Sequence, residues 1–264
     1  MTFYNKTVWI VGASSGIGKS LAINMSKYNV NLILSSRREE ELAKVKEECL
    51  QVSKQCSIIP LDLEKNDDYS KQVEEVGKLG NNIDYLFLVG GISQRSLSSE
   101  TPISIDRRLM EINYFGNISL TKAVLPVMMS KKSGHIIVVS SVVGKFGFPL
   151  RSAYSASKHA LHGYFETLRA EQKVNNINVT IVIPGRVKTR ISYNALLKDG
   201  SKHGEMDAGQ ENGISADSCA KQIIKAVDRN KKEVLIGGKE IYLVWIRKFF
   251  PFLFYRFVNN IQHK

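Results

Sequence analysis

Short apolar segments alternate with longer amphipathic segments along most of the chain. The apolar segments are rich in Val, Ile and Leu, as strands buried on both faces are. The amphipathic segments repeat their apolar residues at helical spacing. This alternation predicts an α/β fold, a parallel sheet with helices on both faces. The expected strands are 7–11, 31–35, 57–61, 84–89, 135–140, 178–183 and 233–236, and the expected helices are 17–27, 39–52, 67–78, 105–130, 153–174 and 216–229.

A glycine-rich turn follows the first expected strand. Val8–Val11 leads into Gly12-Ala13-Ser14-Ser15-Gly16-Ile17-Gly18, a G-x-x-x-G-x-G spacing between a strand and a helix. Glycine permits positive φ and a close approach of pyrophosphate, and the first-turn amides of the helix then face the phosphates. An ordinary glycine turn is the alternative, but a position between a strand and a helix is the context that the dinucleotide-binding motif requires. We therefore predict a dinucleotide site that contains Gly12, Ser14, Ser15, Gly16, Ile17 and Gly18.

The end of the second expected strand bears on which dinucleotide binds. A fold that prefers NAD usually has an acid there for the ribose 2′-hydroxyl, whereas a basic residue suits a 2′-phosphate. This chain has Ser35-Ser36-Arg37-Arg38 and no acid before Glu39. Because the planar guanidinium of Arg37 can grip a phosphate, the sequence favours NADP(H) over NAD(H). A helix-start arginine without a ligand is the alternative.

Residues at two further strand ends would complete this site. Asp62 and Leu63 follow the third expected strand, where they are placed to meet an adenine ring. Asp62 is also a candidate N-cap for the next helix. Gly90 and Gly91 close the fourth strand at the carboxyl edge, where ligands bind in such sheets, although a simple turn would also explain them.

A Tyr-x-x-x-Lys spacing lies in the helix expected at 153–174. Tyr154 and Lys158 share one face of that helix, and Ser141 precedes them at the end of a strand. A phenol has an ordinary pKa of about 10, and a cation within roughly 4–6 Å favours its phenolate. The same spacing is common in solvated helices. The predicted cofactor site is what makes proton transfer the favoured interpretation.

Taken in order, these motifs resemble those of the short-chain dehydrogenase/reductase family over about residues 5–236. The resemblance implies a single Rossmann-type, doubly wound parallel sheet of about seven strands in the order 3-2-1-4-5-6-7. Residues 91–96 and 151–160 are most similar to the branch that holds hydroxysteroid dehydrogenases and acyl-dihydroxyacetone-phosphate-reductase-like enzymes. The matching residues are Gly12–Gly18, Asp62, Gly90-Gly91, Asn113, Ser141, Tyr154, Lys158 and Pro184-Gly185-Arg186-Val187-Lys188-Thr189.

The resemblance also implies a role for each matching residue. Tyr154 would be the general acid/base that protonates a carbonyl oxygen, and Lys158 would lower its pKa and bind the nicotinamide ribose. Ser141 would hold the substrate oxygen. Asn113 would support a water relay to Lys158, although a kink residue inside a helix is its alternative. The residues that would border the nicotinamide are Pro184, Gly185, Val187 and Thr189.

One motif departs from the family pattern. The family usually has Asn-Asn-Ala-Gly at the end of the fourth strand, where this chain has Leu88-Val89-Gly90-Gly91. The asparagine side chain normally braces neighbouring strands, so its loss is expected to affect local stability and cofactor affinity. This departure does not affect the residues that the resemblance assigns to the chemistry.

The alternation stops in the last third of the chain. Residues 186–214 are irregular and contain several glycines, which is typical of a lid or a disordered connector. We expect a single domain over residues 1–264, with a substrate lid at 186–214 and an aromatic and basic C-terminal tail at 239–264.

The net charge of +12 limits the classes of partner. Such an excess suits nucleic acid, an anionic membrane surface or anionic small ligands. No block of five like charges and no nucleic-acid motif occurs, so no nucleic-acid partner is expected. No metal is expected either, and His159 and His162 are interpreted as packing or surface groups.

Cysteine usage and the N-terminus indicate a compartment. Cys49, Cys56 and Cys219 are odd in number and lack C-x-x-C spacing, which indicates reducing surroundings. The N-terminus has no signal-peptide layout, and the apolar runs are shorter than the ~18 residues needed to span a bilayer. We expect an intracellular protein, cytoplasmic or at the cytosolic face of a membrane.

The C-terminal tail mixes aromatic rings with cations. Residues 241–258 hold many aromatic side chains beside Arg247, Lys248 and Arg256. This composition suits peripheral contact with a membrane, with rings at headgroup depth. A helix over the cleft, or one buried between the subunits of the homodimer or homotetramer that the family implies, is an equal alternative. Pro251 would interrupt a single long helix.

Three functions are compatible with this sequence. The favoured one is an NADP(H)-dependent oxidoreductase that transfers a hydride between nicotinamide and a carbonyl or secondary alcohol of a small apolar substrate, steroid-, lipid- or xenobiotic-like. The second is a lipid reductase of acyl-ketone type at a membrane surface. The third is a catalytically idle dinucleotide-binding module, which would have no use for Ser141, Tyr154 and Lys158 together.

Overall fold

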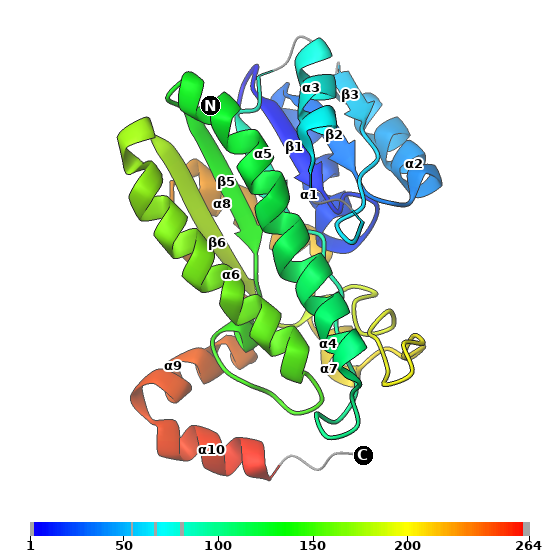
Figure 1. Ribbon diagram of the computed structural model, residues 1–264, viewed down its shortest axis with the longest axis vertical. Coiled ribbons are helices and arrows are strands. Elements are labelled where there is room, and N and C mark those ends of the chain that lie inside the picture. The colour runs from blue at the N-terminus through cyan, green and yellow to red at the C-terminus, as the bar shows by residue number, and fades with distance from the viewer. Residues whose placement is uncertain (1–2, 54, 66–67, 80–81, 261–264) are drawn as a thin grey trace.

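A parallel sheet between two layers of helices forms the body of the protein (Figure 1). The computed structural model describes residues 3–53, 55–65, 68–79 and 82–260. The strand order β3-β2-β1-β4-β5-β6-β9 confirms the predicted order, because β9 is the seventh strand of this sheet. The strands are β1 (Thr7–Val11), β2 (Asn31–Ser35), β3 (Gln55–Ile58), β4 (Tyr85–Leu88), β5 (Gly134–Val139), β6 (Ile177–Pro184) and β9 (Glu233–Ile236).

Each face of the sheet buries its own hydrophobic cluster. Trp9 and Val11 of β1 pack toward one helical layer, and Val8 and Ile10 pack toward the other, as the two-residue period of a strand requires. Burial of one such side chain stabilises the fold by about 1.5–3 kcal/mol. One layer holds α3 (Ser70–Lys78), α4 (Ile103–Met110), α5 (Gly116–Ser130) and α6 (Ser152–Glu171), and the other holds α1 (Gly16–Met25), α2 (Glu39–Leu50) and α8 (Ala216–Asp228).

The third strand differs from its expected position. It pairs with β2 through Gln55–Ile58, so the expectation of 57–61 was wrong by two residues at its start and three at its end. Pro60 has no N–H to donate to a ladder, and this limits how far the strand extends. The helix expected at 67–78 begins at Ser70, and Asp67 lies outside the described residues.

The long helix expected at 105–130 is divided in the structure. A π-helical turn at Glu111–Phe115 separates α4 from α5. The side-chain amide of Asn117 donates to the carbonyl oxygens of Ile112 and Asn113, which ties the start of α5 to this turn. Turns of this kind occur frequently at functional sites.

The irregular segments gather at the carboxyl ends of the strands. The predicted lid contains only β7 (Val187–Lys188), α7 (Ala208–Glu211) and β8 (Ile214–Ser215) as regular elements. The tail forms α9 (Tyr242–Phe249) and α10 (Pro251–Asn259), which lie at the lower end of the molecule in Figure 1. Pro251 begins α10, so the predicted interruption is confirmed. Within the described residues no helix combines the length and apolarity that crossing a membrane requires.

Candidate functional site

A cavity of about 630 Å³ runs along the carboxyl ends of the strands. It brings together the glycine turn, the ends of β2, β4 and β6, the start of α6, the predicted lid and the beginning of the tail. Asn113 does not line the cavity, whereas the other residues to which the sequence assigned a catalytic or cofactor-binding role do. Those lining residues are Gly12, Ser14, Ser15, Gly16, Ile17, Gly18, Arg37, Asp62, Leu63, Gly90, Ser141, Tyr154, Lys158, Pro184, Gly185, Val187 and Thr189.

Backbone packing fixes the glycine turn. Gly12 has a φ of +88°, and a Cβ there would lie 2.6 Å from the backbone nitrogen of Gly90. A Cβ on Gly18 would clash with the carbonyl oxygen of Gly12. The Gly12 amide donates to the Ser35 carbonyl at 2.7 Å, which joins the turn to the end of β2. A bare backbone therefore faces the cavity where a pyrophosphate would meet the first turn of α1.

Two neighbouring arginines stand beside this turn. Arg38 donates to the hydroxyl oxygens of Ser14 and Ser15 at 2.9 and 2.7 Å. Arg37 instead pairs with Glu64 at 3.1 Å, and its Nε lies 3.7 Å from Asp62. Sequence reasoning named Arg37 and missed Arg38, although the two are adjacent. Both guanidinium groups border the end of the cavity that contains the glycine turn.

Asp62 belongs to a tightly held segment after β3. Its carboxylate accepts from the Glu64 amide at 3.0 Å, and its carbonyl accepts from the Tyr69 hydroxyl at 2.9 Å. The alternative of an N-cap is wrong, because α3 begins at Ser70 with Tyr69 in the capping position. The segment is thus held in place as a wall of the cavity.

The strand end that departs from the family pattern is braced by other groups. The amides of Val89 and Gly90 donate to the Val11 carbonyl at 3.0 and 3.1 Å. Asn113, in the π-helical turn, accepts from the Ile92 amide at 2.8 Å and donates to the Ile92 carbonyl at 2.9 Å. It also donates to the Ser157 hydroxyl at 3.0 Å, which ties this strand end to α6.

Ser141, Tyr154 and Lys158 converge at the other end of the cavity. Ser141 follows β5 in extended backbone, and its hydroxyl hydrogen-bonds to the buried Tyr154 phenol. Lys158 is buried one helical turn beyond Tyr154, with its Nζ 5.9 Å from the centre of the phenol ring. That ammonium donates to the Val139 carbonyl at 2.9 Å. The expected set of a hydroxyl, a phenol and an ammonium therefore shares one wall.

Burial controls the protonation of this group. It raises the pKa of Tyr154, while the hydrogen bond from Ser141 and the charges of Arg95 and Arg151 oppose that rise without cancelling it. Burial also lowers the pKa of Lys158 to about 8. Around pH 7 the phenol thus keeps its proton, and the lysine keeps its charge.

Gln94 supports the start of α6 and was missed by sequence reasoning. Its side-chain oxygen accepts from the amides of Ala153 and Tyr154 at 3.0 and 3.3 Å. Its amide nitrogen lies within hydrogen-bonding distance of the hydroxyls of Ser96, Thr101 and Ser152. Gln94 therefore acts as a side-chain cap from another element for the first turn that carries Tyr154.

An ion-pair cluster attaches the predicted lid to the body beside Tyr154. Asp207 accepts from Arg95 in a two-pronged arrangement and from Arg151 at 3.1 Å. Burial raises the pKa of Asp207, but the hydrogen bond from Arg95 and the two positive charges outweigh it, so the pKa is lowered. No local pattern marks these three residues, and their only sequence signal is that Arg95 and Arg151 fall within segments that resemble the family.

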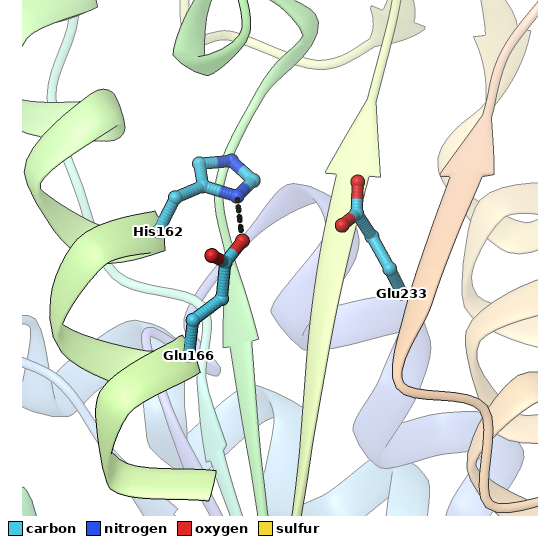
Figure 2. A group of neighbouring side chains, drawn as sticks. All are labelled: His162, Glu166 and Glu233. Carbon is cyan, nitrogen blue, oxygen red and sulfur yellow. Dashed lines mark ion pairs between the residues drawn. The ribbon is translucent and has the colours of Figure 1, made fainter. Parts of the chain in front are cut away.

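His162 lies behind the site in a cluster with Glu166 and Glu233 (Figure 2). Its Nδ1 is 3.8 Å from Glu166, and its Nε2 is 3.0 Å from the hydroxyl of Ser140. The ammonium of Lys145 lies 2.9 Å from Glu233 and 4.0 Å from Glu166, so a side chain already supplies a cation to both carboxylates. Burial, aided by Lys145, lowers the pKa of His162 to about 3.

Comparison with known proteins assigns the chain to a family. Residues 6–199 match the family described as short chain dehydrogenase. The chain belongs to the short-chain dehydrogenase/reductase family. It is 40% identical to dehydrogenase/reductase SDR family protein 7-like of Anopheles gambiae, over 98% of this chain and 84% of that protein. It is 38% identical to dehydrogenase/reductase SDR family member 7B of Mus musculus, over 98% and 82%.

Solved short-chain dehydrogenase/reductase structures share the fold. A short-chain dehydrogenase from Streptomyces avermitilis is 26% identical, with a TM-score of 0.78 over 91% of each chain. A Burkholderia phymatum family member in complex with NAD gives a TM-score of 0.82 at 20% identity over 96% of each chain. An alcohol dehydrogenase of Thermococcus sibiricus complexed with 5-hydroxy-NADP gives 0.76 at 22%, over 89% of this chain and 97% of that one. The last two show the fold alone.

Membership in the short-chain dehydrogenase/reductase family makes the protein an oxidoreductase that uses NAD(H) or NADP(H). The residues present fit such a group. The glycine turn exposes backbone, and Gly16, with a φ of +54°, approaches Thr189 so closely that a Cβ would lie 3.1 Å from its methyl carbon. Gly12–Gly18 and Pro184–Thr189 thus provide facing walls for the dinucleotide.

Proposed function

We propose that the protein is an NADP(H)-dependent reductase of a carbonyl group in an apolar substrate, and that it catalyses the reverse oxidation of the secondary alcohol. The observation that carries this proposal is a single cavity with the glycine turn and two arginines at one end and Ser141, Tyr154 and Lys158 at the other. A dinucleotide that spans it would bring its nicotinamide to the phenol.

The preference for NADP(H) rests on the charge beside the turn. Arg37 and Arg38 border the adenosine end, and Arg108 donates to Glu64 at 2.8 Å, so Glu64 is shared between two guanidinium groups. Three cations thus face two acids, Asp62 and Glu64. This surplus favours a 2′-phosphate over a bare hydroxyl, and the fork of Arg37 would grip it while Arg38 holds the turn.

The preference for an apolar substrate rests on the wall around Tyr154. Aliphatic and aromatic side chains line the cavity together with the cluster of Arg95, Arg151 and Asp207, whose charges are paired with one another. Such a lining selects substrates by shape and apolar area. The lining residues are Ile92, Val142, Val143, Phe146, Phe148, Ile191, Leu196 and Leu243.

The chemistry follows from the protonation states. Bound NADPH would supply a hydride to the carbonyl carbon. Tyr154, which burial keeps protonated, donates its proton to the carbonyl oxygen, and the π electrons of the carbonyl form the new O–H bond. Ser141 donates to the same oxygen as its charge develops, and the charge of Lys158 stabilises the phenolate that remains. Asn113 positions α6 against the end of β4 through Ser157 and Ile92.

Replacement of Tyr154 by phenylalanine tests this proposal. With NADPH and a panel of apolar ketones, Tyr154→Phe should lower turnover by about 10³-fold, because the ring stays and only the proton donor is lost. Turnover is followed as loss of absorbance at 340 nm, and NADPH affinity by fluorescence titration should stay within about twofold.

Tyr164→Phe is the matched control, since Tyr164 lies on the same helix outside the cavity. It should retain full turnover. Equal activity of Tyr154→Phe and the unchanged protein would refute the mechanism. NADPH binding with no turnover of any ketone, lipid ketones included, would favour the idle dinucleotide-binding module.

A further inference from the structure

The two tail helices present an outer face of large apolar side chains. Phe252 is 71% exposed, and the other large apolar side chains of α9, α10 and the residue that joins them are between 48% and 62% exposed. An apolar patch of this size is unusual on a soluble protein and marks an interaction surface. The outer face comprises Tyr242, Trp245, Phe249, Phe250, Phe252, Leu253, Tyr255 and Phe257.

The opposite face of the same helices is anchored to the body. Phe254 is only 2% exposed, and its ring packs against Phe146 with 5.0 Å between centroids. Leu243, Ile246 and Val258 are partly buried against the same core cluster. The exposed rings therefore belong to a pair of amphipathic helices. The inner face of this pair is buried against the body of the protein, and the outer face is available to bind a partner.

The charge of the tail identifies that partner. Residues 241–260 contain Arg247, Lys248 and Arg256 and no acidic residue, in a protein of net charge +12. The guanidinium of Arg247 lies 4.9 Å from the centre of the Tyr255 ring, and the ammonium of Lys248 lies 5.4 Å from that of Phe249. Two copies of this face would repel each other. Aromatic rings interleaved with cations match the headgroup region of an anionic bilayer.

The tail also stands at the mouth of the cavity. Glu240, just before α9, accepts from the amide of Arg186 at 2.7 Å, and both Glu240 and Leu243 line the cavity. In Figure 1 the tail lies beyond the carboxyl ends of the strands, on the same end of the molecule as the lid. A surface that the tail touches is therefore close to the entrance for substrate.

We propose that the outer face of α9 and α10 docks on the surface of an anionic lipid bilayer and directs the cavity mouth toward it. The helices lie in the headgroup region with Phe252 and its neighbours inserted and Arg247, Lys248 and Arg256 beside lipid phosphates. Docking itself does not depend on the proposed function. The delivery of membrane-dissolved carbonyl compounds to Tyr154 does rest on it.

Vesicle binding of the full chain tests the docking. The unchanged protein should co-sediment with phosphatidylcholine vesicles that contain phosphatidylserine, and much less with pure phosphatidylcholine. The double variant Phe252→Ser with Phe257→Ser should reduce the bound fraction at least about tenfold. The double variant Lys248→Glu with Arg256→Glu should remove the dependence on phosphatidylserine.

Val174→Ser is the matched control, because Val174 is 80% exposed on a distant 3₁₀ turn at Gln172–Asn175. It should bind vesicles like the unchanged protein, and circular dichroism should show that all variants are folded. Docking is refuted if the phenylalanine variant binds vesicles normally. It is also refuted if the unchanged protein ignores vesicles and instead sediments as a dimer that Phe252→Ser dissociates.

Substrate delivery is tested separately from docking. With a ketone dissolved in the vesicles, the phenylalanine variant should show a KM raised about tenfold. With a water-soluble ketone its kinetics should be unchanged. Failure of the first result with normal docking would overturn delivery alone, while absence of turnover in the unchanged protein would count against the proposed function and leave docking intact.

Discussion

The two ends of the cavity are built in different ways. At the cofactor end, β1, the glycine turn and α1 follow one another in sequence, and backbone touches backbone, as where a Cβ on Gly12 would meet Gly90. At the proposed substrate end, the predicted lid is held by side chains that come from distant parts of the chain, such as Asp207 between Arg95 and Arg151. The cofactor end is defined by glycines, which have no Cβ to separate the packed backbones. The other end is defined by charged side chains that come together only after folding.

This difference has a functional meaning. Because backbone packs directly against backbone at Gly12 and Gly18, no larger residue fits at these positions, so the cofactor end keeps one shape. Ion pairs and apolar side chains can be replaced singly, so the substrate end can change its specificity without disturbing the sheet. The variants below would test whether the two ends differ in this way.

The largest effect is expected at the third glycine of the turn. A Cβ in Gly18→Ala would clash with the Gly12 carbonyl, and the shift needed to relieve it would move the amides that face the phosphates. We expect NADPH affinity to fall at least about 100-fold and the free energy of unfolding to fall by about 3 kcal/mol. Fluorescence titration and urea unfolding measure the two quantities.

Gly77→Ala provides the comparison, because nothing lies within 4 Å of a Cβ there, on α3. It should raise the free energy of unfolding by about 0.5–1 kcal/mol and leave NADPH affinity unchanged. If Gly18→Ala behaved like Gly77→Ala, backbone packing would not define the cofactor end.

Cofactor preference should change with the charge beside the turn. Arg37→Asp replaces a guanidinium with a carboxylate that repels a 2′-phosphate and suits a 2′-hydroxyl. The ratio of kcat/KM for NADPH to that for NADH should fall about 100-fold. Arg38→Ala should lower affinity for both cofactors by a similar factor, since Arg38 holds Ser14 and Ser15 of the turn. An unchanged ratio in Arg37→Asp would exclude it as the phosphate-binding residue.

Removing the charge that holds the lid should act on substrate binding. Asp207→Asn leaves Arg95 and Arg151 without their carboxylate, so we expect KM for the ketone to rise about tenfold and NADPH affinity to stay constant. Asp199→Asn makes the same chemical change in the same lid, where Asp199 bonds only within its own turn to Ser201. Steady-state kinetics that do not distinguish the two variants would contradict the proposed attachment.

The smallest effect concerns pH. Burial lowers the pKa of Lys158 to about 8, so its charge is present below pH 8 and is lost above it. The kcat/KM for ketone reduction should therefore fall about fourfold between pH 7 and pH 8.5. Lys158→Arg, whose charge persists, should flatten this decline. A profile of the unchanged protein that stays level to pH 10 would contradict the assignment.

The sheet could be predicted because its signals are local. Apolar runs, the glycine turn and the order of motifs lie within short windows, and the strand order followed from the family resemblance. Deviations arose where a local pattern was incomplete. Pro60 altered the third strand, and the π-helical turn at Glu111–Phe115 retains the apolar periodicity that predicted one continuous helix.

The substrate end could not be predicted for the opposite reason. Gln94 bonds to α6 across some 60 residues, and Arg95 meets Asp207 across 112, so neither contact leaves a periodic trace in the sequence. Arg38 was missed because its neighbour Arg37 has the same chemistry, and only the geometry shows which one contacts the turn.

The ion pairs that attach the predicted lid also involve the helix that carries Tyr154, the proposed proton donor. Arg151, which holds Asp207, is the N-cap residue of α6, and Tyr154 lies in the first turn of that helix. We propose that residues 186–214 open as a lid, which would remove a restraint at the first turn of α6, where Tyr154 lies. We expect carbonyl compounds too small to hold the lid shut to react slowly even when they fit beside Tyr154. Selection by size would then occur through the timing of closure as well as through the width of the pocket.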